Sequence, residues 1–360
     1  MNFRLLIGIF LLFSAPIVNA SEMGIQITVE YSKSADVFEL LDNVSNWWPG
    51  FTSDEYPKFW KKNLKSNPKD EDFFKKYKSI RKKHYNDPDQ KEQDPLKNRN
   101  GLFSNSGSLA ADPYAEAFYS SNTLEESYIK LERILSREDL SFIKTFYQHF
   151  ETRYQTIIQS DEREFAGSIE AVRKVFEQKG IKDYFNKVAR FYNSKGNLTY
   201  RVLYTWWPAT HRTSASPAGQ YLIMRNNPIA HKNRNDSEII AHEIIHTIST
   251  NQPLDQKRSL TESFLKTCPI QDKLNKLVIL EEPLAVGFGQ LLFSEKFKPN
   301  QFSLSEDLYN NPWINTFSRL LFLPLKTRFE KGETINQGII EESAKLCFDL
   351  SQTAKLFRSK

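Results

Sequence analysis

The sequence predicts an α+β fold that is predominantly helical, and three observations lead to this prediction. Residues 113–193 place apolar side chains at three- and four-residue intervals, which is the spacing of amphipathic helices. Residues 198–207 and 219–227 are short β-rich runs, separated by the turn-forming stretch PATHRTSASPA. After residue 235 the helical spacing returns and continues to the C-terminus. A small mixed sheet is therefore expected between two helical regions.

The start of the chain has the layout of a cleavable secretory signal. Residues 1–20 contain a charge at Arg4, an apolar run from Leu5 to Phe13 and small residues before Ser21. This run is too short and too interrupted for a comfortable transmembrane span, although an uncleaved anchor is the alternative. We therefore expect a secreted or periplasmic protein without stable membrane insertion after cleavage.

The remaining residues divide into two regions by pattern. Residues 21–195 form a helical N-terminal region that includes the strand-like IQITVEY and a polar, turn-rich loop over residues 86–113. Residues 196–360 contain the predicted sheet and the C-terminal helices. The formal net charge is +5, or +4 without Arg4, and it is spread along the chain. A small net charge that is spread along the chain does not indicate the basic patch that a nucleic-acid partner would require.

Two cysteines, Cys268 and Cys347, lie in the C-terminal third of the chain. In an oxidising compartment a single disulfide between them is the natural interpretation. Two separate buried thiols are the alternative, because sequence spacing does not show proximity. Neither cysteine lies in a CxxC or Cys–His pattern, so we do not expect cysteine ligation of a metal.

The segment NDSEIIAHEIIHTIST carries the spacing of a metal site. Asn235 is the predicted N-cap of a helix, with Glu238 completing a capping box, and NQP at residues 251–253 ends the helix. On such a helix His242 and His246 share one face and can bind a single metal ion. Glu243 lies about 100° around the helix. It is therefore placed to take a proton from a metal-bound water.

The residues around this motif favour a buried helix. IIAHEIIHTI carries no charge apart from the motif glutamate. Buried histidines and a buried carboxylate need partners, and a zinc ion would supply them. The alternative is a core helix with two hydrogen-bonded histidines.

A catalytic zinc site commonly has three protein ligands, and no third histidine follows the motif at a suitable spacing. The later segment LEEPLAVGFGQLLF offers Glu281 and Glu282 at the start of an otherwise apolar helix. Glu262 of LTESFL is a more distant third choice. The alternative is that Glu281 and Glu282 are ordinary acidic residues of a first helical turn before Pro283.

Together, HEIIH and EEPLA resemble the gluzincins, the glutamate-ligand branch of the zincin metallopeptidases. In many gluzincins the third ligand is the glutamate of an E-x-x-A segment on the next major helix, and Glu282-Pro-Leu-Ala285 fits that register. The resemblance implies a zincin-like region with one Zn²⁺ held by His242, His246 and Glu282. Glu243 would then be the general base.

The resemblance covers roughly residues 198–295, and the chain departs from the family pattern in two places. The gap between His246 and Glu282 is longer than in thermolysin-like enzymes, so an extra helix or loop is expected there. Val286 stands where those enzymes carry an aspartate that orients a ligand histidine, which leaves the orienting group open. GQYLIMRNN fits the edge strand that lies along the cleft in zincins, but an ordinary strand is an equal alternative.

The predicted function is that of a secreted zinc metallopeptidase acting on a peptide or protein. The alternatives are a zinc hydrolase acting on a non-peptide bond and a non-catalytic zincin-like binding module. Gluzincins commonly stabilise the oxyanion with a tyrosine or histidine outside the zinc motif, and no spacing chooses among the eligible residues. These are His211, His231, Tyr221 and Tyr309.

Overall fold

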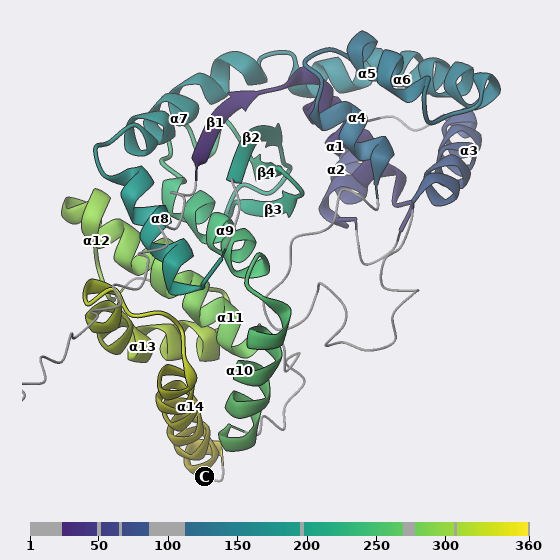
Figure 1. Ribbon diagram of the computed structural model, residues 1–360. Helices are drawn as coiled ribbons and strands as arrows, with labels where there is room; N and C mark the ends of the chain where they lie inside the picture. The colour runs from purple at the N-terminus through teal and green to yellow at the C-terminus, as the bar shows by residue number, and fades with distance from the viewer. Residues whose placement is uncertain are drawn as a thin grey trace, which may run out of the picture.

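A small sheet surrounded by helices forms the centre of the molecule in the computed structural model (Figure 1). The structure describes residues 24–48, 52–64, 67–85, 112–194, 198–268, 278–305 and 308–358. The predicted signal peptide (1–20) lies outside the described residues. The predicted loop over 86–113 also lies outside them, except for its last two residues.

The elements follow one another in the order helices, sheet, helices, with one early strand. The strands are β1 (Ile25–Tyr31), β2 (Leu198–Trp206), β3 (Ser214–Ala218) and β4 (Tyr221–Asn226). The helices before β2 are α1 (Lys33–Ser45), α2 (Glu55–Asn63), α3 (Pro68–His84), α4 (Pro113–Tyr119), α5 (Leu124–Leu131), α6 (Arg137–Ile158), α7 (Asp161–Phe176) and α8 (Ile181–Phe191). The helices after β4 are α9 (Ser237–Thr250), α10 (Leu254–Thr267), α11 (Val278–Ala285), the π-helix η3 (Val286–Leu292), α12 (Phe293–Phe297), the 3₁₀ turn η4 (Pro299–Gln301), α13 (Pro312–Glu330) and α14 (Gln337–Arg358).

These elements confirm the predicted fold class, a predominantly helical α+β architecture with a small mixed sheet. α10 is the additional element expected between His246 and Glu282. β1 belongs to the region 21–195, yet it pairs in parallel with β2, so the sheet joins the two regions of the sequence. Among the described helices none is both long and apolar enough to cross a membrane.

The strand order β1-β2-β4-β3 corrects one prediction. The run over 219–227, expected at the edge, forms the interior strand β4, which pairs with β2 on one side and antiparallel with β3 on the other. The edge strand β3 comes from the stretch predicted to be a turn. Its serine, alanine and proline residues have low strand propensity, but pairing with β4 overrides that preference. Pro217 is tolerated because an edge strand has one side without ladder hydrogen bonds.

Both faces of the sheet are buried, because alternate side chains of the central strands enter two different cores. Val202 and Tyr204 face the first core, which contains α7, α8, α9 and the C-terminal helices. Leu203 of β2 and Ile223 of β4 face the second core, which is built by α1–α6. Figure 1 shows the helices α1–α6 gathered on one side of the sheet and the C-terminal helices at its other end.

Helix α1 is the centre of the second core, and every residue from Ser34 to Ser45 is buried. It nevertheless carries three carboxylates at three-residue intervals, Asp36, Glu39 and Asp42, each with its own partners. Asp42 accepts hydrogen bonds from Arg81, Tyr77 and Trp47. Glu39 pairs with Arg225 of β4 at 2.6 Å and accepts from the Tyr119 hydroxyl. Asp36 accepts from the backbone N–H of Trp206 at 2.6 Å and from the Tyr31 hydroxyl at 3.0 Å.

The C-terminal helices are tied together by the cysteines. Cys268, which caps α10, and Cys347 of α14 lie at disulfide distance, with Cα atoms 5.8 Å apart. Both residues are buried in the first core. This is the pairing expected for an oxidising compartment. It joins α10, the helix that follows the one carrying the two histidines, to α14, the last helix of the chain.

Two buried carboxyl groups meet where the two cores join. Asp36 of α1 and Asp161, the first residue of α7, lie close enough for their carboxyl groups to interact, and both side chains are almost fully buried. Burial raises the pKa of Asp36 to about 7. Burial and the neighbouring Asp36 charge raise the pKa of Asp161 to about 9. The folded protein therefore retains protons there that the unfolded chain releases near pH 4.

We expect the Asp161→Asn substitution to reduce the loss of stability at alkaline pH. Because both carboxyl pKa values are raised by folding, their contribution is fully present below about pH 4 and is lost as the pH rises through about 7 to 9. An amide stays neutral. The variant should exceed the wild type by at least about 1.4 kcal/mol in the free energy of unfolding at pH 9, the equivalent of one pKa unit.

Urea unfolding at pH 4, 7 and 9 measures this difference, with Glu162→Gln, at an exposed position of the same helix, as the control. A loss of stability in Asp161→Asn that is the same at every pH would contradict the expectation.

Candidate functional site

Helix α9 places both predicted histidines in the interior, on the face that meets α11 and η3. His242 is 5% exposed and His246 2% exposed. The helix begins at Ser237, and its N-cap is Asp236 rather than the predicted Asn235. Asn235 instead accepts a hydrogen bond from the Ser237 N–H. The predicted capping box is also wrong, because Glu238 forms an ion pair with Lys298.

Asp236 is held from several directions. Arg234 lies 2.8 Å from one of its oxygens, and Asn226 of β4 and Tyr204 of β2 donate to the other. The start of the helix is thus anchored to the sheet, which explains why the cap shifts by one residue. The histidine positions along α9 are fixed from this anchored end.

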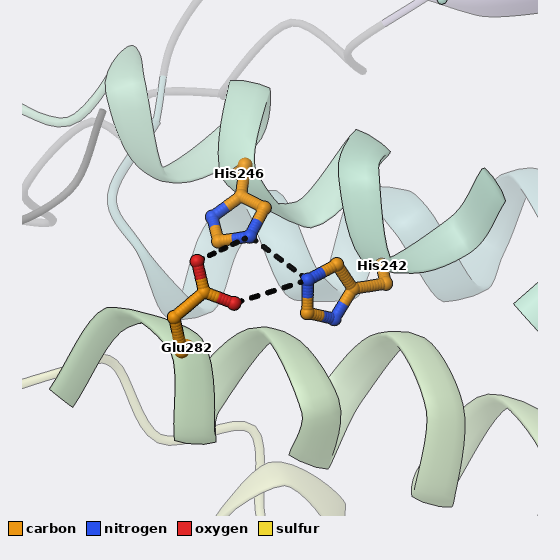
Figure 2. Close-up of side chains that lie close together, drawn as sticks. All are labelled: His242, His246 and Glu282. Atoms are coloured by element: carbon orange, nitrogen blue, oxygen red, sulfur yellow. Dashed lines mark hydrogen bonds and ion pairs between the residues drawn. The ribbon is translucent and has the colours of Figure 1, made fainter. Parts of the chain in front are cut away.

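Glu282 of α11 faces the two histidines (Figure 2). His242 Nε2 lies 3.3 Å from Glu282 Oε2, and His246 Nε2 lies 3.5 Å from Glu282 Oε1. The two Nε2 atoms are 3.0 Å apart. One donor atom from each residue lies within 4.8 Å of the others, and all three side chains are buried. The structure therefore brings the three predicted ligands together.

Glu281 has a different position from its neighbour. Its Oε1 atom lies 2.8 Å from His246 Nδ1, on the opposite edge of the imidazole from Nε2. Its side chain is as buried as that of Glu282, at 4% exposure. From the sequence, Glu281 is considered as a second-choice ligand or as an ordinary acidic residue of a first helical turn. The group that orients a ligand histidine is left open. The adjacency of two glutamates in an apolar helix was the signal that could have indicated this second role.

Charges in this cluster act strongly on one another because the cluster is buried. Burial opposes ionisation of Glu282, but hydrogen bonds from His242 and His246 outweigh it and hold the Glu282 pKa well below its usual range. Burial also disfavours a charged His246, yet Glu281 raises the pKa of His246 well above its usual range. Burial raises the pKa of Glu243 although both histidines act to lower it. A raised carboxyl pKa brings Glu243 closer to neutral pH, where a general base is most effective.

The helix opposite α9 changes its winding after Ala285, three residues beyond Glu282. The π-helix η3 presents Gly289 to the backbone of α9, where a Cβ atom would lie 2.3 Å from the His242 Cα. The widened winding leaves the carbonyl of Phe288 to accept a hydrogen bond from the Tyr184 hydroxyl of α8. π-helical segments are uncommon and frequently occur at functional sites.

The remaining predicted residues separate clearly. Glu243 is half-buried, and its charge interacts with those of His242, His246 and Glu282. Glu262 is exposed on α10 and is not part of the cluster.

Of the four residues considered for the oxyanion, Tyr309 lies at the cluster. Its ring centroid is 6.3 Å from that of His242, and its hydroxyl is close enough to Glu282 for the two groups to interact. Burial and the Glu282 charge raise the Tyr309 pKa well above its usual range. Tyr221 is instead part of the second core, His211 is exposed, and His231 contacts Arg234.

The residues present fit a zinc ion. Two imidazole nitrogens and one carboxylate are a ligand set that zinc accepts, with an open position left for water. Tetrahedral bonds of about 2.0–2.1 Å place ligand atoms roughly 3.3 Å apart. The three separations of 3.0, 3.3 and 3.5 Å lie around that value. His242 Nδ1 is buried and has no hydrogen-bond partner among the described residues. The contacts of this ring are made by its other nitrogen, Nε2.

Comparisons of the chain with protein-family models, curated proteins and solved structures return no match. The likeness to gluzincins therefore rests on the two motifs and on the arrangement of the four residues that they contribute.

We expect Gly289→Ala to damage the site through packing alone. The new methyl group would meet the α9 backbone at His242, so the two helices must separate, at a cost of about 1–3 kcal/mol. Gly287→Ala is the matched control, because its methyl group would meet only the end of the Leu325 side chain. Thermal unfolding and zinc binding should both deteriorate in Gly289→Ala and change little in Gly287→Ala. Equal behaviour of the two variants would contradict the close contact.

Proposed function

We propose that this protein is a zinc-dependent metallopeptidase of gluzincin type. The single observation that carries the proposal is the buried cluster of His242, His246 and Glu282, with Glu243 on the following helical position. Glutamate side chains are almost never fully buried unless they have a charged or hydrogen-bonding partner, and here two of them are buried beside two histidines. The segment over residues 1–20 supports a secreted or periplasmic location.

Zinc in this site would polarise a substrate carbonyl and lower the pKa of a coordinated water. The protein contributes the proton transfers. Burial raises the pKa of Glu243. A raised pKa suits a carboxylate that accepts a proton from the water and then delivers it to the leaving amine. Glu282 would hold the ion as a carboxylate ligand and so would not compete for that proton.

Tyr309 would supply the group that stabilises the oxyanion. Its hydroxyl lies beside Glu282, and its strongly raised pKa keeps it protonated as a hydrogen-bond donor. An extended peptide could pair with the antiparallel edge strand β3, which is the sheet edge and contacts α9. This assigns to β3 the role that the sequence assigned to residues 219–227.

We expect Glu243→Gln to retain about one zinc per chain and to lower peptide hydrolysis by roughly 10²–10⁴-fold. His246→Ala should lose the zinc, since it removes a ligand. Metal content by mass spectrometry and cleavage of a peptide library are the two measurements.

Their outcomes separate the candidate functions. A wild-type protein purified without chelator and free of metal would favour a hydrogen-bonded core and contradict the proposal. Zinc without hydrolysis of any peptide would favour a binding module or a non-peptide substrate. Hydrolysis that survives Glu243→Gln would exclude the proposed base.

We expect Tyr309→Phe to lower kcat by about 10²-fold while leaving zinc content and KM nearly unchanged. The reason is that the hydroxyl acts on charge that develops in the transition state. His211→Ala serves as the control, because this exposed histidine was an equal choice by sequence and lies away from the cluster. A kcat that falls equally in both variants would remove the assignment of Tyr309.

A further inference from the structure

We propose that Glu281 is the positioning residue of the site and that it fixes the ring of His246 for metal binding. This inference rests on the proposed function, since it concerns the same metal site. Glu281 Oε1 and His246 Nδ1 are 2.8 Å apart, and both side chains are at most 4% exposed. A carboxyl oxygen at that distance accepts a hydrogen bond from the ring N–H.

The hydrogen bond determines which nitrogen carries the proton. With Nδ1–H donated to Glu281, the lone pair of a neutral His246 ring lies on Nε2, the atom that faces His242 and Glu282. Glu281 therefore selects the tautomer that can bind a metal and prevents rotation of the ring. His242 has no such support, because its Nδ1 finds no partner among the described residues. The two ligand histidines are thus unequal, and His246 is the one held in advance.

Lys257 of α10 lies at the end of α9. Its Nζ donates to the carbonyl of Thr250, the last residue of α9, at 2.9 Å. Its charge also interacts with that of Glu281. Lys257 therefore brings a positive charge from α10 to the end of α9, and this charge acts on the carboxyl group of Glu281.

The two adjacent glutamates therefore have different roles in the site. Neighbouring helical positions point about 100° apart, so only one of them can face the point between the two Nε2 atoms. Glu282 occupies that direction, and Glu281 reaches the far edge of the His246 ring. No other carboxylate among the described residues contacts a ring nitrogen of His242 or His246.

The test compares zinc affinity in Glu281→Ala, Glu281→Gln and the wild type by competition with a chromophoric chelator. Loss of the orienting group should weaken zinc binding by about 10–100-fold in Glu281→Ala. Glu281→Gln retains an acceptor oxygen and nearly the same volume, so it should fold normally and show a smaller loss. Glu262→Ala is the control, because it removes an exposed carboxylate of α10.

A second readout reports the tautomer directly. In the zinc-free protein, at a pH high enough for the His246 ring to be neutral, long-range ¹H–¹⁵N spectra of the imidazoles should show the proton on Nδ1 in the wild type and in Glu281→Gln. In Glu281→Ala they should show a mixture of tautomers. A purely structural role of Glu281 would lower stability without changing the ring protonation.

Three results would overturn or separate the inferences. Wild-type zinc affinity in Glu281→Ala overturns the role of Glu281 and leaves the proposed function intact. Zinc that is lost in Glu281→Ala but retained in Glu282→Ala makes Glu281 a ligand and also overturns it. Normal zinc binding with the expected Glu281 effects, but without peptide hydrolysis, supports the positioning role and contradicts the proposed peptidase.

Discussion

The contact between the backbones of α9 and η3 is the constraint on which the site depends. At Gly289 the two chains approach so closely that a single added carbon would lie 2.3 Å from the His242 Cα. With the helices at that separation, the short reach of a glutamate is enough to place Glu282 within 3.5 Å of both imidazoles. A larger residue at Gly289 would widen the gap and leave buried polar groups without partners, which is costly in an apolar interior.

The same contact requires compensation elsewhere in the fold. A π-helix disturbs the regular hydrogen bonding of the helix, and the hydroxyl of Tyr184 bonds to the Phe288 carbonyl. At the other side of α9, Asp236 is bound by groups of β2 and β4. The helix is therefore fixed at its start by the sheet and along its length by η3. Both attachments lie in the first core, whereas the acidic residues of α1 attach the second core to the same strands through Arg225 and the Trp206 N–H.

Sequence reasoning predicted the fold class and the residues that meet, but not the details that depend on packing. Helical periodicity and the spacing of His242, His246 and Glu282 are local signals, and the structure brings these three side chains together. The strand β3 has no local signal, because its polarity and its proline indicate a turn until β4 pairs with it. The cap at Asp236 and the network around Asp42 and Arg81 are likewise set by distant partners that no local pattern identifies.

The adjacent glutamates show most clearly where the sequence reaches its limit. A motif register favours Glu282 over Glu281 as a ligand, and the geometry agrees with that choice. The register does not indicate what Glu281 does, because its contact with His246 depends on the rotation of α11 relative to α9. When an apolar helix buries a carboxylate beside two histidines, the N–H groups of the imidazole rings also need hydrogen-bond acceptors. Glu281, the residue before Glu282, provides an acceptor for His246 Nδ1 from the same helical turn. No other secondary-structure element is needed to reach that edge of the His246 ring.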